Sequence, residues 1–341
     1  MNNDYMLFAI AMIPVLWLII SLGVLKMPAH KTCSFTVILT LIIAMICWRM
    51  KFIDGITATV EGMAIALWPI LLVIVAALFT YNLAVETKTM DVIKTMLSSI
   101  TTDKRIQVLI LAWLPYILLC VLILLASPLV PSINAFLAKA SSNIHIYTGD
   151  STSTTAFSWI NTPGMMILIA TFIAGLIQKL KFTYMLDVLK RTIIQLKTSF
   201  ITIMSIVAIS KIMSHSGMTS SISFGLCAIT GSFYPLISPL LGAIGTFVTG
   251  SDTSANILFG ALQTEAAKSL SIDPYWIAAA NTAGATAGKM ISPQSIAIAT
   301  SATGLIGSEG KILSTTVKYC LGYVVILGLI VYFGGGILTL F

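Results

Sequence analysis

The stretch 250-GSDTSANILFGALQ-263 decides how this chain folds, because it interrupts an otherwise apolar sequence. Asp252 is the only formally charged residue between Lys211 and Glu265, and small or hydroxyl-bearing residues surround it. Glycine and proline break helices, and every break frees backbone polar groups that need partners. In apolar surroundings such a break is tolerated only inside protein or beside water. The stretch therefore predicts a polar site enclosed by helices.

The composition places this site in a membrane protein. Hydrophobic residues make up 57% of the chain and charged residues 9%, whereas a soluble domain has about 25% charged residues. The net charge of +7 comes from basic residues in short loops, which argues against a nucleic-acid partner. Five scattered cysteines form no CxxC pair, so no metal and no cofactor are expected. We predict an all-α polytopic protein whose partner is the lipid bilayer.

The apolar runs and the basic loops predict the topology. The basic loops are 26–31, 86–105 and 179–197, which we expect in the cytoplasm with the N-terminus outside. The polar loop 131–162 and the loop 49–61, which contains two bases and two acids, are then external. Three segments follow: N-terminal spans in 1–113, central spans in 114–217, and a transport-type region in 218–341. The expected spans are 5–25, 32–48, 62–85, 106–130, 163–178, about 198–217, and 318–340.

The C-terminal segment contains three broken stretches, 233–250, 250–263 and 279–304, as in the discontinuous helices of transporter sites. One short helix is expected to begin within 251–254 and reach about Gln263, and a second to begin at Ser292-Pro293. Two helix N-termini at one depth favour an anion. Asp252 is the candidate proton-exchanging acid. The candidate anion-binding residues are Ser251, Thr253, Ser254, Asn256, Gln263, Asn281, Lys289, Ser292 and Gln294.

Simpler interpretations of the same residues stay open. Asp252 can be only a helix cap, and Lys289 can reach toward the membrane interface without binding anything. Gly284 and Gly288 have the small-xxx-small spacing of closely packed helices. His145 and His215 have no nearby ligand partners, so we interpret them as loop or helix-end histidines. No catalytic constellation is found, and an enzyme is not expected.

At these residues the chain resembles a known family. The stretches 245-GTFVTGSDTSANILFGALQ-263 and 278-AAANTAGATAGKMISPQSIAIATSATGLIG-307 are similar to those of the L-lactate permease family, as are 80–113 and 115–125. The resemblance implies a bacterial plasma-membrane carrier that takes up L-lactate and related 2-hydroxy monocarboxylates, such as glycolate, with protons. It also implies an ion-transporter-superfamily-like fold with inverted repeats and a re-entrant hairpin in the C-terminal third.

The resemblance further implies roles for the candidate residues. Lys289 and the two helix N-termini would hold the carboxylate, and Asn281 and Gln263 would recognise the hydroxyl. Asp252 would carry the proton. Whether these residues serve uptake depends on how much of the carrier this chain retains.

The chain departs from the family pattern after Trp113. Family members continue there into further spans, whereas Trp113 here runs directly into Leu114 and Pro115 of a segment that lies much later in the family. One repeat is therefore expected to be incomplete. The alternative function is an internally deleted, transport-deficient remnant or an interaction subunit of a full-length carrier, and a homo-oligomer stays open.

Overall fold

A computed structural model describes residues 2–21, 25, 27–87, 106–150, 154–249, 252–292, 295–296 and 309–338. The chain divides into two compact units. Unit 1 comprises Met1–Met63, Tyr147–Gly149 and Thr202–Phe341, and unit 2 comprises Ala64–Ile146 and Asp150–Ile201. Each unit is described by itself. The three segments expected from the sequence stay a prediction.

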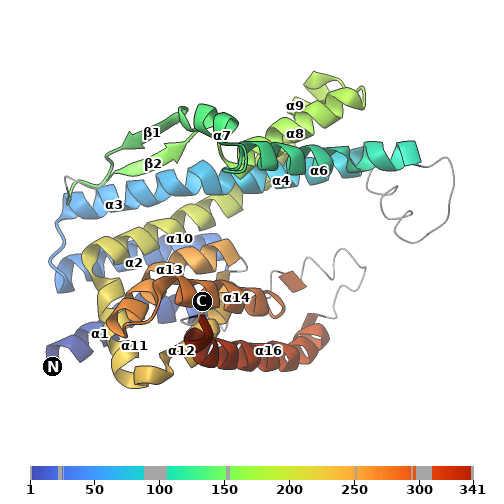
Figure 1. Ribbon diagram of the computed structural model, residues 1–341. Helices are drawn as coiled ribbons and strands as arrows, with labels where there is room; N and C mark the ends of the chain where they lie inside the picture. Colours follow the sequence, from blue (N-terminus) through green and yellow to red (C-terminus); the bar gives the residue numbers. More distant parts are fainter. Residues whose placement is uncertain are drawn as a thin grey trace. The chain divides into compact units, whose positions relative to one another are not determined.

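Unit 1 is helical and carries most of the residues expected at the site (Figure 1). Asp273 begins one of its helices by accepting a hydrogen bond from the Tyr275 amide, with Pro274 in the first turn. Its helices, wholly or in the larger part, are α1 (Asn2–Ile19), α2 (Ala29–Cys47), α3 (Phe52–Ile65), α10 (Lys197–Ser216), α11 (Met218–Thr230), η3 (Gly231–Phe233), α12 (Tyr234–Thr249), α13 (Asp252–Ser269), α14 (Pro274–Lys289) and α16 (Glu309–Leu338).

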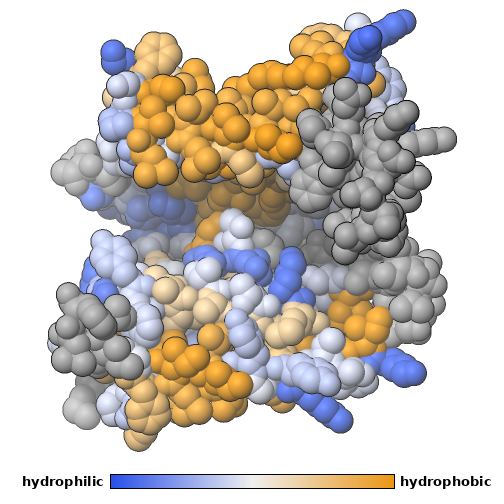
Figure 2. Space-filling view, turned by 45° about the vertical axis from the view of Figure 1, so that its right-hand side comes forward, coloured by the Kyte–Doolittle hydropathy of each residue, from blue (hydrophilic) through white to orange (hydrophobic). Residues whose placement is uncertain are grey.

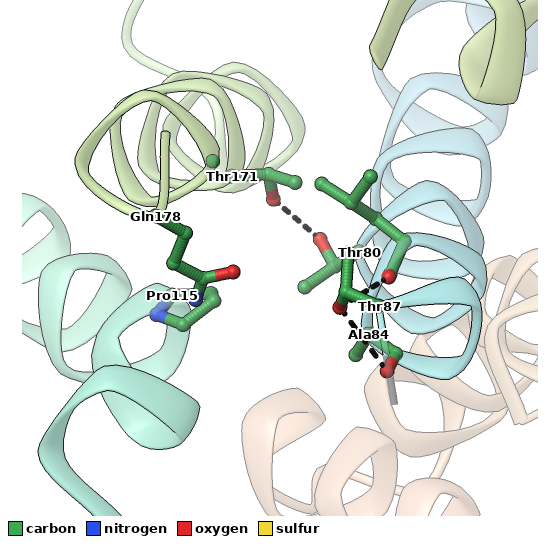
Figure 3. A pocket seen from close by; sticks show the side chains of 8 residues that line it. Thr80, Ala84, Thr87, Pro115, Thr171 and Gln178 are labelled. Carbon is green, nitrogen blue, oxygen red and sulfur yellow. Dashed lines mark hydrogen bonds between the residues drawn. The ribbon is translucent and has the colours of Figure 1, made fainter. Parts of the chain in front are cut away.

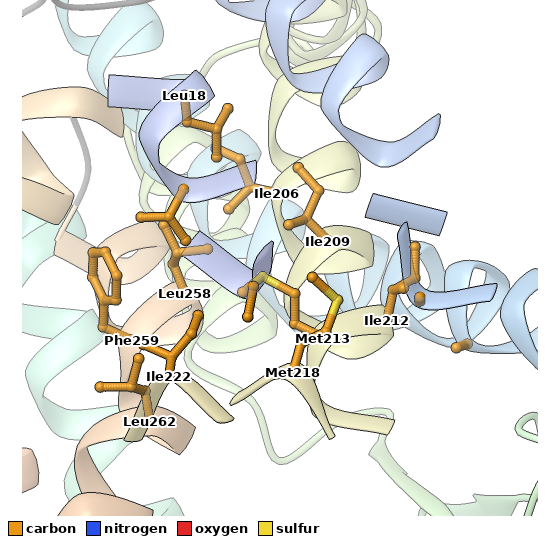
Figure 4. Packing of buried hydrophobic residues seen from close by; sticks show 14 of the residues in the cluster. Leu18, Ile206, Ile209, Ile212, Met213, Met218, Ile222, Leu258, Phe259 and Leu262 are labelled. Atoms are coloured by element: carbon orange, nitrogen blue, oxygen red, sulfur yellow. The ribbon is translucent and has the colours of Figure 1, made fainter. Parts of the chain in front are cut away.

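The main apolar core of unit 1 lies where α10, α11 and α13 meet α1 (Figure 4). Ile209 and Ile212 of α10 and Met218 of α11 are fully buried there. Phe259 and Leu262 of α13 complete the contact from the side of the broken region. Burial of such side chains stabilises each by about 1.5–3 kcal/mol, so α13 is anchored by its apolar face.

Unit 2 joins four longer helices to a small sheet. In this sheet β1 (Ser141–Ile144) pairs antiparallel with β2 (Thr155–Ser158). The indole of Trp68 donates to the Ser158 carbonyl at 2.8 Å, which fixes the hairpin to the unit. The predicted loop 131–162 thus contains a strand pair. The helices are η2 (Ala66–Leu71), α4 (Leu72–Glu86), α6 (Ile106–Ala126), α7 (Pro131–Ala138), α8 (Pro163–Ile177) and α9 (Phe182–Gln195).

The described helices confirm an all-α polytopic membrane protein. Five are long and apolar enough to cross a membrane, and a sixth span results if the bent pair Leu114–Ala126 and Pro131–Ala138 counts as one. Figure 2 shows broad areas of apolar side chains on the described surface. Isoleucine, leucine and phenylalanine side chains that water would disfavour are exposed on several helices, for example Ile46 on α2 and Phe333 on α16. Such faces suit contact with lipid.

Helices occupy two segments that the sequence predicts as loops. Residues 49–61, which contain two bases and two acids, become helical from Phe52, with Asp54 in the first turn where a carboxylate is favourable. Residues 179–197 contain α9, an amphipathic helix that buries Met185 and Val188 and leaves its charged residues outside. In both cases, charged residues on one face or at one end of a helix were interpreted as a loop between spans.

Candidate functional site

The helices α12 and α14 pack with their backbones in contact. A Cβ atom added to Gly284 would collide with the backbone of Pro239, and one added to Gly288 would collide with that of Ala243. Gly242 likewise lies against the Asn281 carbonyl. The prediction that Gly284 and Gly288 mediate close helix packing is confirmed. Small residues at this spacing allow such an approach, and they bring polar groups of both helices within reach of α13.

Gln263 is the centre of a polar network in the middle of these three helices. Its side chain is fully buried. Its Oε1 accepts from Tyr234 Oη at 2.8 Å and from Ser238 Oγ at 3.0 Å. Its Nε2 donates to the Ser238 carbonyl at 3.0 Å and to Asn281 Oδ1 at 3.1 Å. Both amide hydrogens and both lone pairs are therefore used, as a buried amide requires.

The network continues through two more amides and a hydroxyl. Asn281 Nδ2 donates to Asn256 Oδ1 at 2.8 Å, and Thr282 Oγ1 donates to the same atom at 3.0 Å. Asn281 is fully buried, whereas Thr282 is exposed. The structure thus brings together three residues that the sequence nominated: Asn256, Gln263 and Asn281. In this conformation they bind one another and join α12, α13 and α14.

The direction of the helices shows which residues share an end of this bundle. Because Pro239 lies beside Gly284 and Ala243 beside Gly288, α12 and α14 run in the same direction. The helix α13 runs the opposite way, since its Ala255 lies beside Gly245 whereas its Gln263 bonds to Ser238. The end of α12, the start of α13 and the end of α14 therefore lie at one end of the bundle.

Buried polar atoms without partners gather at that end. Thr246 and Ser292 are fully buried, and neither Thr246 Oγ1 nor Ser292 Oγ has a hydrogen-bond partner within the described chain. Asp252 Oδ1, at the first residue of α13, is also enclosed and unpartnered there. Leaving such an atom unpaired costs about 1–3 kcal/mol. Three of them at one end indicate a site that is completed by something other than these helices.

The remaining candidates are placed as follows. Lys289 occupies the last turn of α14 at this same end and is exposed, as is Thr253 beside Asp252. The prediction that the helix after Asp252 is short is wrong, because α13 continues to Ser269. The apolar face of α13 explains the extra turns, since Ala266 and Ala267 are buried. Ser251, Gln294, the side chain of Ser254 and most of the predicted second half-helix lie outside the described residues.

A charged cluster in unit 1 escaped the sequence analysis. Glu61 on α3 is 5% exposed, and its two oxygens bind Lys211 Nζ at 2.8 Å and His215 Nε2 at 2.7 Å. His215 lies in the last turn of α10, which confirms its interpretation as a helix-end histidine, but Glu61 is a partner that the sequence did not indicate. Lys211 and His215 are four residues apart in an apolar helix, and Glu61 is the only acid between Asp54 and Glu86. That spacing was the available signal.

Unit 2 contains a small pocket of a different kind (Figure 3). Its hydroxyls are engaged, since Thr80 Oγ1 and Thr171 Oγ1 bond to each other. No predicted site residue lines it, and no charged residue is among its described lining side chains. The lining residues are Thr80, Leu83, Ala84, Thr87, Pro115, Thr171, Gly175 and Gln178. The pocket therefore offers nothing that would attract an ion.

The fold defines a polytopic membrane protein in which polar groups are enclosed between helices. A family model described as L-lactate permease matches residues 7–114 and 109–337. The chain belongs to the L-lactate permease family. The two matched segments overlap at 109–114, around the junction after Trp113 that the sequence indicates.

Individual relatives agree with the family match. An L-lactate permease of Streptococcus iniae is 30% identical over 439 aligned positions, which cover 79% of this chain and 93% of that protein. An L-lactate permease of Bacillus subtilis (strain 168) is 43% identical over 162 residues, 48% of this chain and 29% of that protein. The glycolate permease GlcA of Escherichia coli (strain K12) is 38% identical over 174 residues, 51% of this chain and 31% of that protein. No solved structure matches the chain.

Proposed function

We propose that this chain takes up L-lactate and related 2-hydroxy monocarboxylates, such as glycolate, by proton symport across a bacterial plasma membrane. The observation that carries the proposal is the set of unpartnered polar atoms, Thr246 Oγ1, Asp252 Oδ1 and Ser292 Oγ, at one end of the α12–α14 bundle. A hydroxy acid brings both donors and acceptors to such atoms. The names of the relatives, L-lactate permease and glycolate permease, support this substrate class.

Each candidate residue has a chemical role in this proposal. Lys289, an exposed cation at the same end of the bundle, attracts the carboxylate. The hydroxyls of Ser292 and Thr246 bind the substrate's polar oxygens. Asp252 accepts the transported proton, because its Oδ1 is enclosed at the start of α13 and has no hydrogen-bond partner within the described chain. Further binding groups at the helix starts are Ser251, Thr253, Ser254 and Gln294.

The middle of the bundle contributes in a different way. Asn256, Gln263 and Asn281 already satisfy one another, so their contact with substrate requires that α13 and α14 separate. Such a rearrangement fits a discontinuous, re-entrant element of the ion-transporter type. The positive-inside pattern of the basic loops supports an external N-terminus.

One observation favours a second candidate function, that of a transport-deficient remnant or an interaction subunit. The alignment with the Streptococcus iniae protein contains 439 positions, more than the 341 residues of this chain, so that protein has internal positions that this chain lacks. The overlapping family matches at 109–114 mark the same place. On this reading the chain inserts in the membrane and assembles with a full-length carrier or with copies of itself.

Uptake of labelled L-lactate into membrane vesicles tests both functions. The native chain should accumulate lactate when the outside is acidified, and Asp252→Asn should abolish accumulation while retaining exchange of labelled for unlabelled lactate. Asp273→Asn is the matched control, since Asp273 caps α14 on the surface and asparagine caps equally well. Unchanged accumulation in Asp252→Asn overturns the proton role. No exchange by the native chain overturns the carrier and favours the second function.

A further inference from the structure

The Glu61–Lys211–His215 cluster lies within apolar helices that are long enough to cross a membrane. Glu61 belongs to the span Phe52–Glu86, and Lys211 and His215 belong to Lys197–Ser216. Charged groups cost several kcal/mol in such a place, so they are retained mainly where they pair or act. A single Glu–Lys pair would already be balanced. The histidine adds a third group, which a purely structural pair does not need.

The hydrogen bonds fix where a proton can bind. Lys211 Nζ donates to Glu61 Oε1, and an ionised carboxylate only accepts hydrogen bonds. His215 Nε2 must therefore carry a hydrogen toward Glu61 Oε2 at 2.7 Å. The free position of the ring is Nδ1, for which the described chain provides no hydrogen-bond partner. Because the side chain of His215 is 20% exposed, a proton can reach Nδ1 from outside the helix pair.

The ring of His215 also contacts an aromatic side chain. Tyr147 stacks on His215 with ring centroids 3.7 Å apart and planes at 11°. Thr148, the next residue, donates to Asp54 Oδ1 at 2.9 Å, which holds this segment on α3. The titratable groups that face His215 are thus Glu61 of α3, Lys211 of α10 and Tyr147. Close contact between α3 and α10 at the neighbouring Gly62 keeps the cluster in place.

Protonation changes the charge of this cluster by one unit. With a neutral ring, Glu61 and Lys211 cancel. When Nδ1 binds a proton, the imidazolium leaves a net charge of +1 between two membrane helices, and no described acid besides Glu61 contacts the ring to balance it. A monocarboxylate is the counter-ion that a carrier of such anions supplies. Proton and anion then favour each other's binding, which is the definition of coupling.

We propose that His215, held by Glu61 and Lys211, is a proton-binding site that makes uptake of the monocarboxylate depend on pH. This site is distinct from Asp252, and the inference rests on the proposed transport function. Glu61 acts as a positioning residue, because it orients the ring and leaves Nδ1 as the proton acceptor. Lys211 sets the charge balance that a bound proton upsets.

Uptake of labelled L-lactate at several pH values, under saturating exchange conditions, tests this site in transport. We expect uptake by the native chain to rise as the pH falls, because protonation of the ring favours binding of the monocarboxylate, and uptake by His215→Gln to vary by less than about twofold. Glutamine can still donate to Glu61, so the helix pair is retained. The matched control His145→Gln, in an exposed position, should keep the native profile.

A second measurement keeps the proposal testable if a variant fails to insert or the native chain transports nothing. The chain has three histidines, so ¹⁵N-histidine NMR of the full chain in micelles gives the ring signals of three residues, which are assigned with His30→Gln and His145→Gln. The remaining ring signals, those of His215, should change with pH as Nδ1 binds a proton, and this change should differ in Glu61→Gln. A His215 ring that does not titrate, or a native pH profile in His215→Gln, overturns the proposal. Titration without any lactate exchange overturns only the transport function.

Discussion

Buried polar atoms are hydrogen-bonded in the middle of the α12–α14 bundle and unpaired at its end. In the middle, all four hydrogen-bonding positions of Gln263 are occupied by Tyr234, Ser238 and Asn281. At the end, Thr246 Oγ1, Asp252 Oδ1 and Ser292 Oγ have no partner within the described chain. A satisfied network stabilises a particular packing, whereas unsatisfied atoms lower stability until a ligand completes them. The comparison separates residues that hold the helices together from residues whose buried polar atoms the described helices leave unpaired.

The largest loss of unfolding free energy is expected at Gln263, the centre of the hydrogen-bonded network. Gln263→Leu keeps the volume of the side chain but leaves Tyr234 Oη and Asn281 Oδ1 buried without their partner. We expect a loss of roughly 2–4 kcal/mol of unfolding free energy. Denaturation in mixed micelles, followed by circular dichroism, measures it. Thr264→Val, whose hydroxyl bonds only within its own helix, is the control, and an equal effect in both variants contradicts the role of the network.

The close contact between the backbones of α12 and α14 predicts the next largest loss of stability. Gly284→Ala places a methyl group against the Pro239 backbone, so α12 and α14 must separate at a cost of roughly 1–3 kcal/mol. Gly260→Ala on α13 has nothing within 4 Å of the new methyl and should stabilise the helix by about 0.5–1 kcal/mol. The same denaturation experiment compares the two. If both variants changed the unfolding free energy in the same direction, α12 and α14 would not pack this closely.

Substitutions at the unpaired end of the bundle should leave stability unharmed and lower uptake instead. Ser292→Ala and Thr246→Val remove hydroxyls that have no partner within the described chain, so stability should stay the same or rise by up to about 1 kcal/mol. Lactate uptake should instead fall by about tenfold for each lost hydrogen bond to substrate. Ser238→Ala, in the satisfied middle, is the control and should lose stability. Unchanged uptake in both end variants removes them from the binding site.

The smallest effect lies outside the membrane spans, on α9. The pKa of Tyr184 is raised because its hydroxyl donates to Glu86 Oε2 at 2.7 Å, and ionisation would break that bond. A raised pKa in the folded state means that the bond stabilises the fold below the ordinary tyrosine pKa and that this contribution is lost as pH rises through the shifted value. Ultraviolet titration should show the pKa of Tyr184 falling in Glu86→Gln. A pKa that stays the same would remove Glu86 as the cause.

The sequence predicted the elements that depend on local pattern. Seven apolar runs correspond to helices, and Gly284 and Gly288 pack as their spacing indicates. It also selected Asn256, Gln263 and Asn281, because amides are rare in apolar stretches. The sequence failed for 49–61, where four charged residues favoured a loop. The helix there became plausible only once the structure showed the partners of Glu61.

The partners of Glu61 could not be read from its surroundings in the chain. Lys211 is 150 positions away from Glu61 and His215 is 154 positions away. Hydropathy and helix breaking are properties of neighbouring residues, so a window along the sequence registers each of the three as an isolated charge. Only the pairing of Glu61 with Lys211 and His215 in the folded chain makes these charges tolerable within membrane helices.

The sequence by itself therefore determined the class of the protein, its helical membrane architecture, its relation to the L-lactate permeases and the region where polar groups are enclosed. The architecture and the enclosed region follow from apolar length and from the positions of glycine, proline and amide residues, which act locally. The relation to the permeases follows from the similarity of stretches such as 245–263 and 278–307. Only the tertiary structure decided which polar atoms are satisfied and which are not. That distinction separates Gln263, whose bonds are complete, from Asp252 and Ser292, and it depends on where α12, α13 and α14 meet.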